Sequence, residues 1–356
     1  MITEVVSAIL SVWVCCQCPS EGLDPFTAEA SNPDRSKPDV LASVDFSPDG
    51  KQMLIAFWSQ IVLAEMDGKK ITHIYTVPGN YRTIDCAMFA GSGYAFLQDD
   101  HTLQLLDRAG NTVWRMSDTA AIAVSANGKR MATIGPNRTI SVYELAFPRP
   151  CRLESIFLLH EPTESSGWKK LFFVPMIRFF PSDESLAGCV YGISSFSVSR
   201  PEFFVAQREN GGQAKWYSGR IHSQIQLNFP YVVLLHGNDK TRIHDVRTGQ
   251  QVMSYCRGMD APLYSAWVSS RGDKMMLIYS REVLVVDPRN GDTLSRLPLP
   301  GRASHAFPFA FSGMCNRIAI GTLDGNVLLI DCAECRIVGT IQTWALLHRG
   351  NERYPR

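Results

Sequence analysis

Residues Phe307–Thr343, FPFAFSGMCNRIAIGTLDGNVLLIDCAECRIVGTIQT, contain four short apolar runs separated by turns. The runs FPFAFS, RIAIG, NVLLID and RIVGTIQT are rich in β-branched and aromatic residues, as β-strands are. The first two turns contain glycine with asparagine or aspartate, which favour tight bends. This stretch therefore predicts one four-stranded antiparallel sheet of about 40 residues.

The same unit recurs along the chain, and an acidic residue that closes the third run marks each copy. This acid occurs at Glu65, Asp107, Glu144, Asp245, Asp287 and Asp331. The intervals are 42, 37, 101, 42 and 44 residues, so the long interval must hold a degenerate fourth unit and an insertion. The pattern predicts seven units between about residues 41 and 343.

Repeated sheets of this length predict an all-β fold, a seven-bladed β-propeller of four-stranded antiparallel blades. A lone four-stranded sheet exposes two apolar faces, and radial stacking buries both against neighbouring sheets. A four-stranded unit of about 40 to 45 residues is typical of a propeller blade. The coils of a parallel β-helix are shorter, and a β-sandwich needs no regular period of this length. No helical period is sustained within the units.

Sequence motifs in the turns carry a resemblance to a known superfamily. Phe46–Gly50 reads FSPDG, Ser125–Gly128 and Ser270–Asp273 echo it, and the third strands end in acids. These features resemble WD-repeat and, more broadly, quinoprotein-like (YVTN-type) β-propellers over roughly 300 residues. The resemblance implies a structural role for acids in the second turns, at Asp100, Asp239 and Asp324.

The chain also departs from the WD-repeat pattern. No third strand ends in Trp-Asp, and the Gly-His pair before the first strand is missing. The polar network of that family therefore cannot be complete in any blade. We expect the blades to be held together by apolar packing between them instead.

The chain divides into three regions: residues 1–40, with an apolar segment and a proline-rich linker; residues 41–345, the propeller with an insertion at about 145–175; and residues 346–356, a short basic tail. The apolar segment Val5–Cys16 is too short to cross a bilayer as a helix. It lacks the preceding Lys or Arg and the following cleavage site of a signal peptide. An extra strand and a start codon assigned too early are the alternatives. We expect a cytoplasmic protein, with a secreted or periplasmic one as the alternative.

Composition bears on the class of partner. The formal net charge is +1 and the charges are scattered, which gives no electrostatic argument for nucleic acid or an anionic membrane. The 10 cysteines do not have the spacing of a disulfide framework, which favours free thiols in a reducing compartment. We expect a monomeric domain that binds protein partners, binds no nucleic acid and has no membrane span.

Candidate partner-binding residues cluster on one predicted face. In a propeller, the loops before each first strand and after each second strand share a face, and loops often carry function. Aromatic and arginine side chains are frequent anchors of interfaces. The candidates are Trp58, Tyr81, His101, Arg138, Arg200, His236, Lys240, Arg281 and His305 on this face, and Trp168 in the insertion. The alternative for each is an ordinary surface residue.

Catalytic signatures are missing from the sequence. It contains no GxSxG, HExxH, GxxxxGK[ST] or GxGxxG motif, and the predicted inner strands hold few ionisable groups beyond Asp45 and Asp85. Cys332 and Cys335 form a CxxC in a predicted turn, without the further ligands that zinc needs or the helix that usually follows a redox CxxC. We expect a non-catalytic interaction scaffold with no catalytic residue, cofactor or metal. The alternative is a lactonase-like or quinone-dependent enzyme, or a small-molecule binder, with a site in the central channel.

Overall fold

The structure is a computed structural model in which a defined part of the chain is described. It describes residues 41–66, 70–78, 83–125, 127–135, 139–146, 150–157, 171–179, 185–194, 197–198, 202–207, 214–218, 225–228, 231–236, 240–245, 248, 250–256, 263–269, 273–300, 309–312, 317–322 and 326–342. Among these residues, no helix has the length and apolar character required to cross a membrane.

The described strands form seven antiparallel sheets, each made of strands that follow one another in sequence. The first three sheets contain β1 (Leu41–Phe46), β2 (Gln52–Phe57), β3 (Gln60–Glu65) and β4 (Ile71–Thr76); β5 (Ile84–Ala90), β6 (Gly93–Gln98), β7 (Leu103–Leu106) and β8 (Thr112–Met116); and β9 (Ala121–Val124), β10 (Arg130–Ile134), β11 (Thr139–Glu144) and β12 (Cys151–Phe157).

The fourth sheet contains one short strand more than the others, β15, which pairs with β14. The remaining sheets are β13 (Leu171–Phe179), β14 (Ser185–Ser194), β15 (Ser197–Val198), β16 (Glu202–Gln207) and β17 (Ala214–Ser218); β18 (Ile225–Asn228), β19 (Tyr231–His236), β20 (Lys240–Asp245) and β21 (Gln251–Cys256); β22 (Leu263–Val268), β23 (Met275–Tyr279), β24 (Glu282–Val286) and β25 (Thr293–Pro298); and β26 (Phe309–Ser312), β27 (Arg317–Gly321), β28 (Val327–Asp331) and β29 (Arg336–Ile341).

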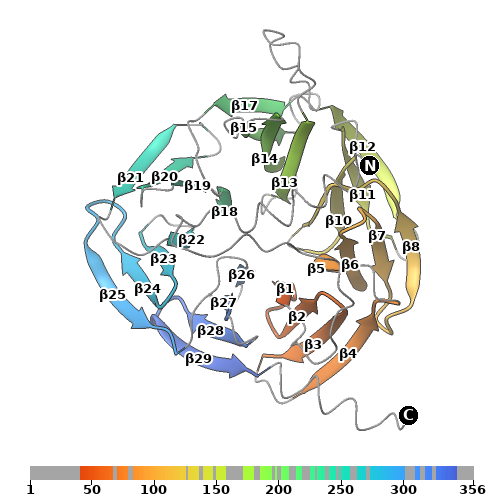
Figure 1. Cartoon of the computed structure of the whole chain (residues 1–356), viewed down its shortest axis with the longest axis horizontal. Coiled ribbons are helices and arrows are strands. Elements are labelled where there is room, and N and C mark those ends of the chain that lie inside the picture. Colours follow the sequence, from red (N-terminus) through yellow and green to blue (C-terminus); the bar gives the residue numbers. More distant parts are fainter. Residues whose placement is uncertain are drawn as a thin grey trace.

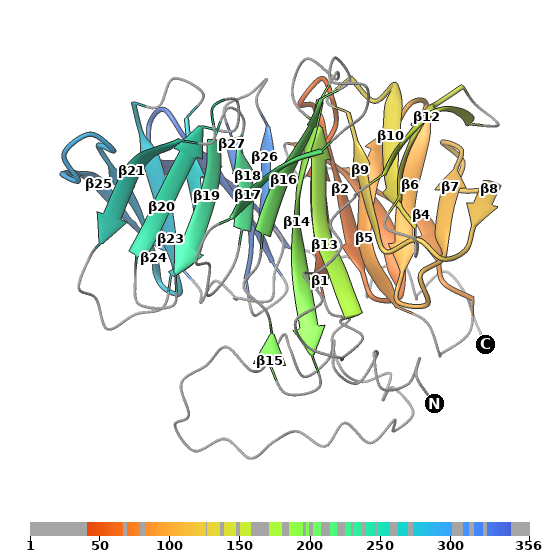
Figure 2. The ribbon, with the colours of Figure 1, turned by 90° about the horizontal axis from the view of Figure 1, so that it is seen from above.

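The sheets are arranged around a central axis, with the first strand of each sheet innermost and the last strand on the perimeter (Figure 1; the side view is Figure 2). Inner strands of successive sheets contact one another, as β1 does with β5 and β5 with β9. The predicted all-β propeller of four-stranded antiparallel blades is confirmed. The described sheets also equal in number the seven units read from the sequence.

Apolar clusters between neighbouring sheets hold the ring together. Between the first two sheets, for example, Leu54 and Ile61 pack with Phe96 and Tyr94. Comparable clusters join the second sheet to the third, the third to the fourth, the fifth to the sixth and the sixth to the seventh. Burial of such side chains contributes roughly 1.5 to 3 kcal/mol each. Packing between blades thus has the stabilising role expected from the incomplete polar network.

The ring closes by side-chain packing between the last sheet and the first. Ala319 and Leu329 of the last sheet share a buried cluster with Leu41, Met53 and Ile55 of the first. Each of these two sheets is complete with its own four consecutive strands. No exchanged strand is therefore needed among the described residues, while Val5–Cys16 lies outside them.

A repeated serine fixes the turn between the first and second strands. Ser47 Oγ donates to Asp49 Oδ1 at 2.7 Å and accepts from Gln52 N–H at 2.9 Å, and Gly50 has φ 68°. Ser125 Oγ similarly donates to Asn127 Oδ1 at 2.9 Å and accepts from the Arg130 N–H at 2.9 Å. The motif that carried the family resemblance is therefore a hydrogen-bonded turn in the structure.

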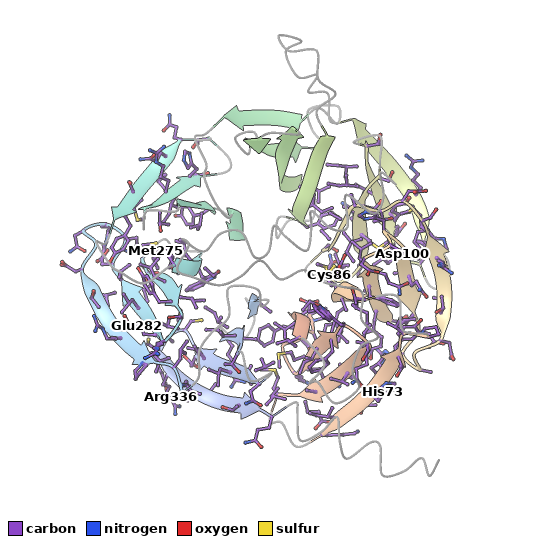
Figure 3. The ribbon with its side chains drawn as sticks, viewed as in Figure 1. His73, Cys86, Asp100, Met275, Glu282 and Arg336 are labelled. Atoms are coloured by element: carbon purple, nitrogen blue, oxygen red, sulfur yellow. The ribbon has the colours of Figure 1, made fainter. Side chains whose placement is uncertain are left out.

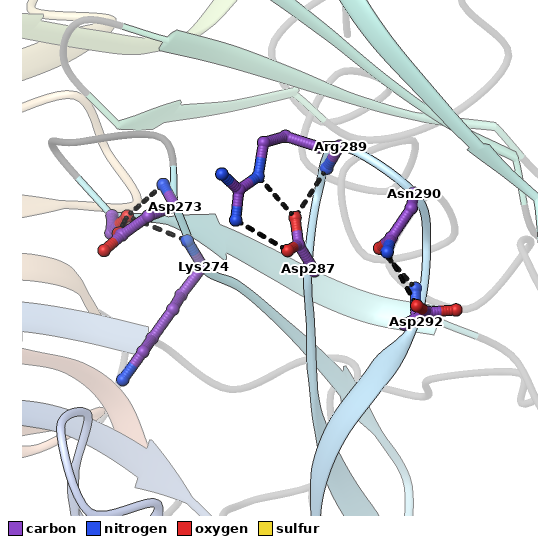
Figure 4. Close-up of polar contacts among 7 residues, drawn as sticks. Asp273, Lys274, Asp287, Arg289, Asn290 and Asp292 are labelled. Carbon is purple, nitrogen blue, oxygen red and sulfur yellow. Dashed lines mark hydrogen bonds and ion pairs between the residues drawn. The ribbon is translucent and has the colours of Figure 1, made fainter.

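The repeated acid at the end of the third strand caps the next turn. Asp107 Oδ1 accepts from the Ala109 and Asn111 N–H groups, each at 2.9 Å. Asp287 Oδ1 accepts from the Arg289 N–H at 2.9 Å, and its carboxylate also pairs with the Arg289 guanidinium (Figure 4). A hydrogen bond from the Asn111 side chain, together with the backbone ones, lowers the pKa of Asp107. The Arg289 side chain, followed by its N–H group, lowers the pKa of Asp287. The acid that marks the repeat thus has a local structural role.

The predicted insertion at about 145–175 contains parts of two blades. β12 and the first residues of β13 lie within it. Residues 158–170 lie outside the described part of the chain, so the insertion and the other domain boundaries stay predictions.

Candidate binding face

One face of the ring carries the turns between the second and third strands of each sheet, and we call it the second-turn face. The first strand begins beside the end of the second, because Leu41 pairs with Phe57 in the first sheet and Ile84 with Gln98 in the second. The connections that precede the first strands therefore lie on the same face, as the sequence analysis assumed.

Among the described residues of this face, Trp58 is the large aromatic that is exposed. It lies in the turn between β2 and β3, and 48% of its surface is exposed. The Ile84 N–H of the next sheet donates to the Trp58 carbonyl oxygen at 2.9 Å, and the Val77 N–H donates to the Ser59 carbonyl oxygen at 2.8 Å. The indole is thus exposed on a backbone that two hydrogen bonds hold in place.

His101 lies in the equivalent turn of the second sheet, in a left-handed conformation with φ 61°. Its N–H donates to the Gln98 carbonyl oxygen at 2.9 Å, and its own carbonyl oxygen accepts from Thr119 N–H at 2.9 Å. The preceding Asp100 accepts from the Thr102 N–H at 3.0 Å through Oδ1. A non-glycine residue in this conformation is uncommon, and such residues concentrate at functional sites.

Asp85 is close to this turn, at the beginning of inner strand β5. The β5–β6 register shifts between Ile84 and Cys86, so Asp85 is the extra residue of a β-bulge. The Asp99 N–H donates to the Thr83 carbonyl oxygen at 3.0 Å, which fixes the start of β5 beside the turn. Bulges often redirect a side chain next to a binding site.

Three carboxylates make this sector of the face negative. The Asp85 side chain contacts solvent on one side, yet protein surrounds the rest of it. This burial, followed by repulsion from Asp99 and Asp100, raises the pKa of Asp85 to about 7. Asp100 and Cys86, the neighbour of Asp85, are labelled in the second sheet in Figure 3. The sector formed by Trp58, Asp85, Asp99, Asp100 and His101 is called the acidic sector below.

The structure places the other candidate residues as follows. Arg281 is exposed in the turn between β23 and β24, on the same face but in the sixth sheet, so the last sheet separates it from Trp58. His236 and Lys240 pair with each other at the ends of β19 and β20, which puts their backbone on this face. Tyr81, Arg138, Trp168, Arg200 and His305 lie outside the described residues.

The two inner-strand acids noted in the sequence have different surroundings. Asp45 Oδ2 accepts from the Phe89 N–H of the next inner strand at 2.9 Å, and Ser43 Oγ accepts from the Ala87 N–H at 2.7 Å. Asp45 therefore joins the first two blades. Asp85 instead lies with Asp99 and Asp100 in the acidic sector. Asp85 and Asp99 were missing from the candidate residues, although the acidic pair after β6 is visible in the sequence.

Within the described ranges, no group of three or more His, Cys, Asp or Glu side chains is placed to hold a metal ion.

Comparisons with known proteins support the fold. No protein family model matches the chain, and no curated protein matches it. Among solved structures, the chain is similar to the Dos1 propeller, with a TM-score of 0.57 and 14% sequence identity over 86% of this chain and 85% of that one. At this identity the similarity extends to the architecture alone, and the chain is a β-propeller.

Proposed function

We propose that this chain is a non-catalytic, WD-repeat-like propeller that binds a protein partner through the acidic sector of its second-turn face. The observation that carries the proposal is the exposed indole of Trp58 on a hydrogen-bonded turn. Exposed aromatic side chains on rigid supports are common anchors of interfaces because little conformational entropy is lost when they bind.

Electrostatics indicate the chemistry of the partner segment. Asp85, Asp99 and Asp100 are close enough for the latter two to raise the pKa of the first. A lysine or arginine of a partner would relieve this repulsion and lie near the indole face of Trp58, which attracts cations. Binding should therefore weaken as salt is raised.

The non-catalytic part of the proposal rests on the surroundings of Asp85. The charges that shift its pKa are carboxylates alone. General acid–base catalysis needs a nucleophile or donor positioned with the titrating group. Repulsion among carboxylates favours the approach of a cation, and we propose that attracting a cation is the role of this group.

Affinity capture with the full-length chain tests the proposal. Wild type, Trp58→Ala and Leu294→Ala are used as baits, and captured proteins are quantified by mass spectrometry. Leu294 is the matched control because it is also a large exposed apolar residue, 52% exposed, on outer strand β25. We expect Trp58→Ala to lose a protein that wild type and Leu294→Ala both retain.

Titration of the purified partner then gives the size of the effect. Removing a central aromatic anchor costs about 2 kcal/mol or more, which weakens binding roughly 30-fold. Equal capture by wild type and Trp58→Ala would show that the partner does not bind this sector. An equal loss with Leu294→Ala would mean that exposed apolar surface in general, and not this face, retains the partner.

A further inference from the structure

The CxxC motif lies in a tight hairpin turn of the last sheet. β28 ends at Asp331 and β29 begins at Arg336, and these two residues pair with each other. Asp331 Oδ1 accepts from the Ala333 N–H at 2.9 Å and from the Glu334 N–H at 3.0 Å, which fixes the bend between the cysteines. The first and fourth residues of a turn have Cα atoms within about 7 Å, close to the range of roughly 4.4 to 6.8 Å that a disulfide needs.

Both cysteine side chains lie on the same side of this turn. Cys332 is 3% exposed and belongs to the apolar cluster between the sixth and seventh sheets, which also includes Trp267 and Ile330. Cys335 packs against that same cluster and is only half-buried. The two sulfur atoms therefore share one environment, and Cys335 is the one that solvent can reach.

Cys335 also occupies a backbone position that sister turns give to glycine. Its φ is 50°, while Gly291 and Gly110 have φ 78° and 87° in the equivalent turns of the sixth and second sheets. Glycine adopts this region without the steric cost that a Cβ brings. Cys335 therefore carries a steric cost that glycine would avoid at this position, and strained backbone of this kind clusters at functional sites.

We propose that Cys332 and Cys335 form a reversible disulfide across this turn, a modification site that reacts with small-molecule disulfides such as glutathione disulfide. The Cys335 thiolate attacks one sulfur of the oxidant and releases one glutathione thiolate. The Cys332 thiolate then attacks Cys335 Sγ and releases the second. The two protein thiols lose two electrons and two protons, and two molecules of glutathione are formed.

The bond would fix a turn at the junction of two blades. Lys274 Nζ of the sixth sheet lies 3.5 Å from the Ala333 carbonyl oxygen inside the turn. The cluster beneath the cysteines joins the sixth and seventh sheets. Oxidation would therefore stiffen a turn that packs on the sixth sheet, in the blade that closes the ring against the first sheet.

Differential alkylation of the full-length chain tests this proposal. The folded protein is equilibrated at graded ratios of glutathione disulfide to glutathione, quenched in acid, and alkylated in denaturant before digestion with trypsin. Cleavage after Arg317 and Arg336 puts both cysteines, and no others, in the peptide 318–336. We expect this peptide to change from doubly alkylated to an unalkylated form lighter by two hydrogens, with singly alkylated peptide staying a minor species.

Control variants separate a disulfide from ordinary thiol chemistry. Cys332→Ala should abolish the form that lacks two hydrogens and leave Cys335 alkylated or carrying glutathione. If that variant does not fold, Cys335→Ser should also abolish the form and leave Cys332 alkylated. The peptide 83–108 contains Cys86 alone and should never lose two hydrogens. A peptide 318–336 that stays doubly alkylated in excess glutathione disulfide, or that accumulates one glutathione, would overturn the proposal.

Discussion

The turn between β7 and β8 should tolerate no side chain at Gly110. Its φ is +87°, and a Cβ built there would lie 2.0 Å from the Ile74 carbonyl oxygen of the neighbouring sheet. That oxygen is backbone and cannot move aside without shifting β4. We therefore expect Gly110→Ala to destabilise the protein by two separate effects, one within the turn and one between the blades.

The two contributions have different sizes. A left-handed conformation costs an L-residue about 1 to 2 kcal/mol. Forcing an extra methyl into a packed interior costs roughly a further 1 to 3 kcal/mol. The more restricted unfolded chain of the alanine variant offsets about 0.4 to 1 kcal/mol of this sum. The net destabilisation of Gly110→Ala should be about 1 to 4.5 kcal/mol.

Gly291→Ala is the matched control, since it removes glycine from the equivalent turn of the sixth sheet. Its φ is +78°, but its nearest neighbours are Tyr255 ring carbons at 3.4 and 3.5 Å, an ordinary contact distance. This variant should lose only the conformational contribution, about 1 kcal/mol. The difference between the two variants isolates the collision with the neighbouring blade.

Urea denaturation followed by tryptophan fluorescence and circular dichroism measures this difference, since the chain has 7 tryptophans as reporters. Gly110→Ala should unfold at clearly lower urea than Gly291→Ala, and both below wild type. Equal urea midpoints of unfolding for the two variants would refute the claim that the Gly110 turn packs too closely on β4 to admit a Cβ.

Three other predictions concern the carboxylates. Asp45→Ala should lower stability by about 1 to 3 kcal/mol because it leaves the Phe89 N–H without its acceptor; Asp45→Asn, which keeps a carbonyl oxygen, should lose less in the same urea assay. The pKa of Asp107 is lowered in the folded protein, so its carboxylate contributes stability above pH 4 that is lost as pH falls through the folded-state pKa. Asp107→Ala lacks this group, and its melting temperature should therefore depend less on pH than that of wild type. The pKa of Asp85 is raised to about 7, so wild type should lose stability relative to Asp85→Asn as pH rises from 4 to 8. A difference in melting temperature between the two proteins that stays constant over this range would contradict the raised pKa.

The sequence predicted the fold because each blade repeats its own local signals. Apolar runs of strand length, the serine turn and the acid at the end of the third strand all recur within one unit. The structure shows that Ser47 and Asp107 act inside single turns, through contacts a few residues apart. Such local interactions produce a sequence pattern that recurs in each unit and can be detected in a single sequence. Among the strands that the structure describes, the extra strand β15 has no counterpart in the other units, and it was not predicted.

The binding face was harder to predict because its geometry depends on contacts between blades. Trp58 was found as an aromatic in a second turn, but the hydrogen bond that holds its turn comes from Ile84 of the next sheet. Asp85 lies in the acidic sector because of a β-bulge, and at a bulge side chains no longer alternate between the two faces of the sheet as they do along a regular strand. A periodicity argument assigns faces by alternation and so misses a residue displaced in this way.

Net charge gave no indication of the acidic sector, and physical reasons explain why. The whole chain has a formal charge of +1, so the field far from the protein is weak. Charges separated by more than about 8 Å are largely screened at physiological salt, and recognition depends on the nearest groups. Asp99 and Asp100 are adjacent in sequence and Asp85 lies near them only in the folded ring, where burial, followed by repulsion from these two carboxylates, raises the pKa of Asp85 to about 7. Under the proposed function, a nearly neutral propeller would bind a basic segment at short range, and its net charge gives no long-range attraction for nucleic acid. This combination favours binding that depends on the fit around Trp58 more than on charge at a distance.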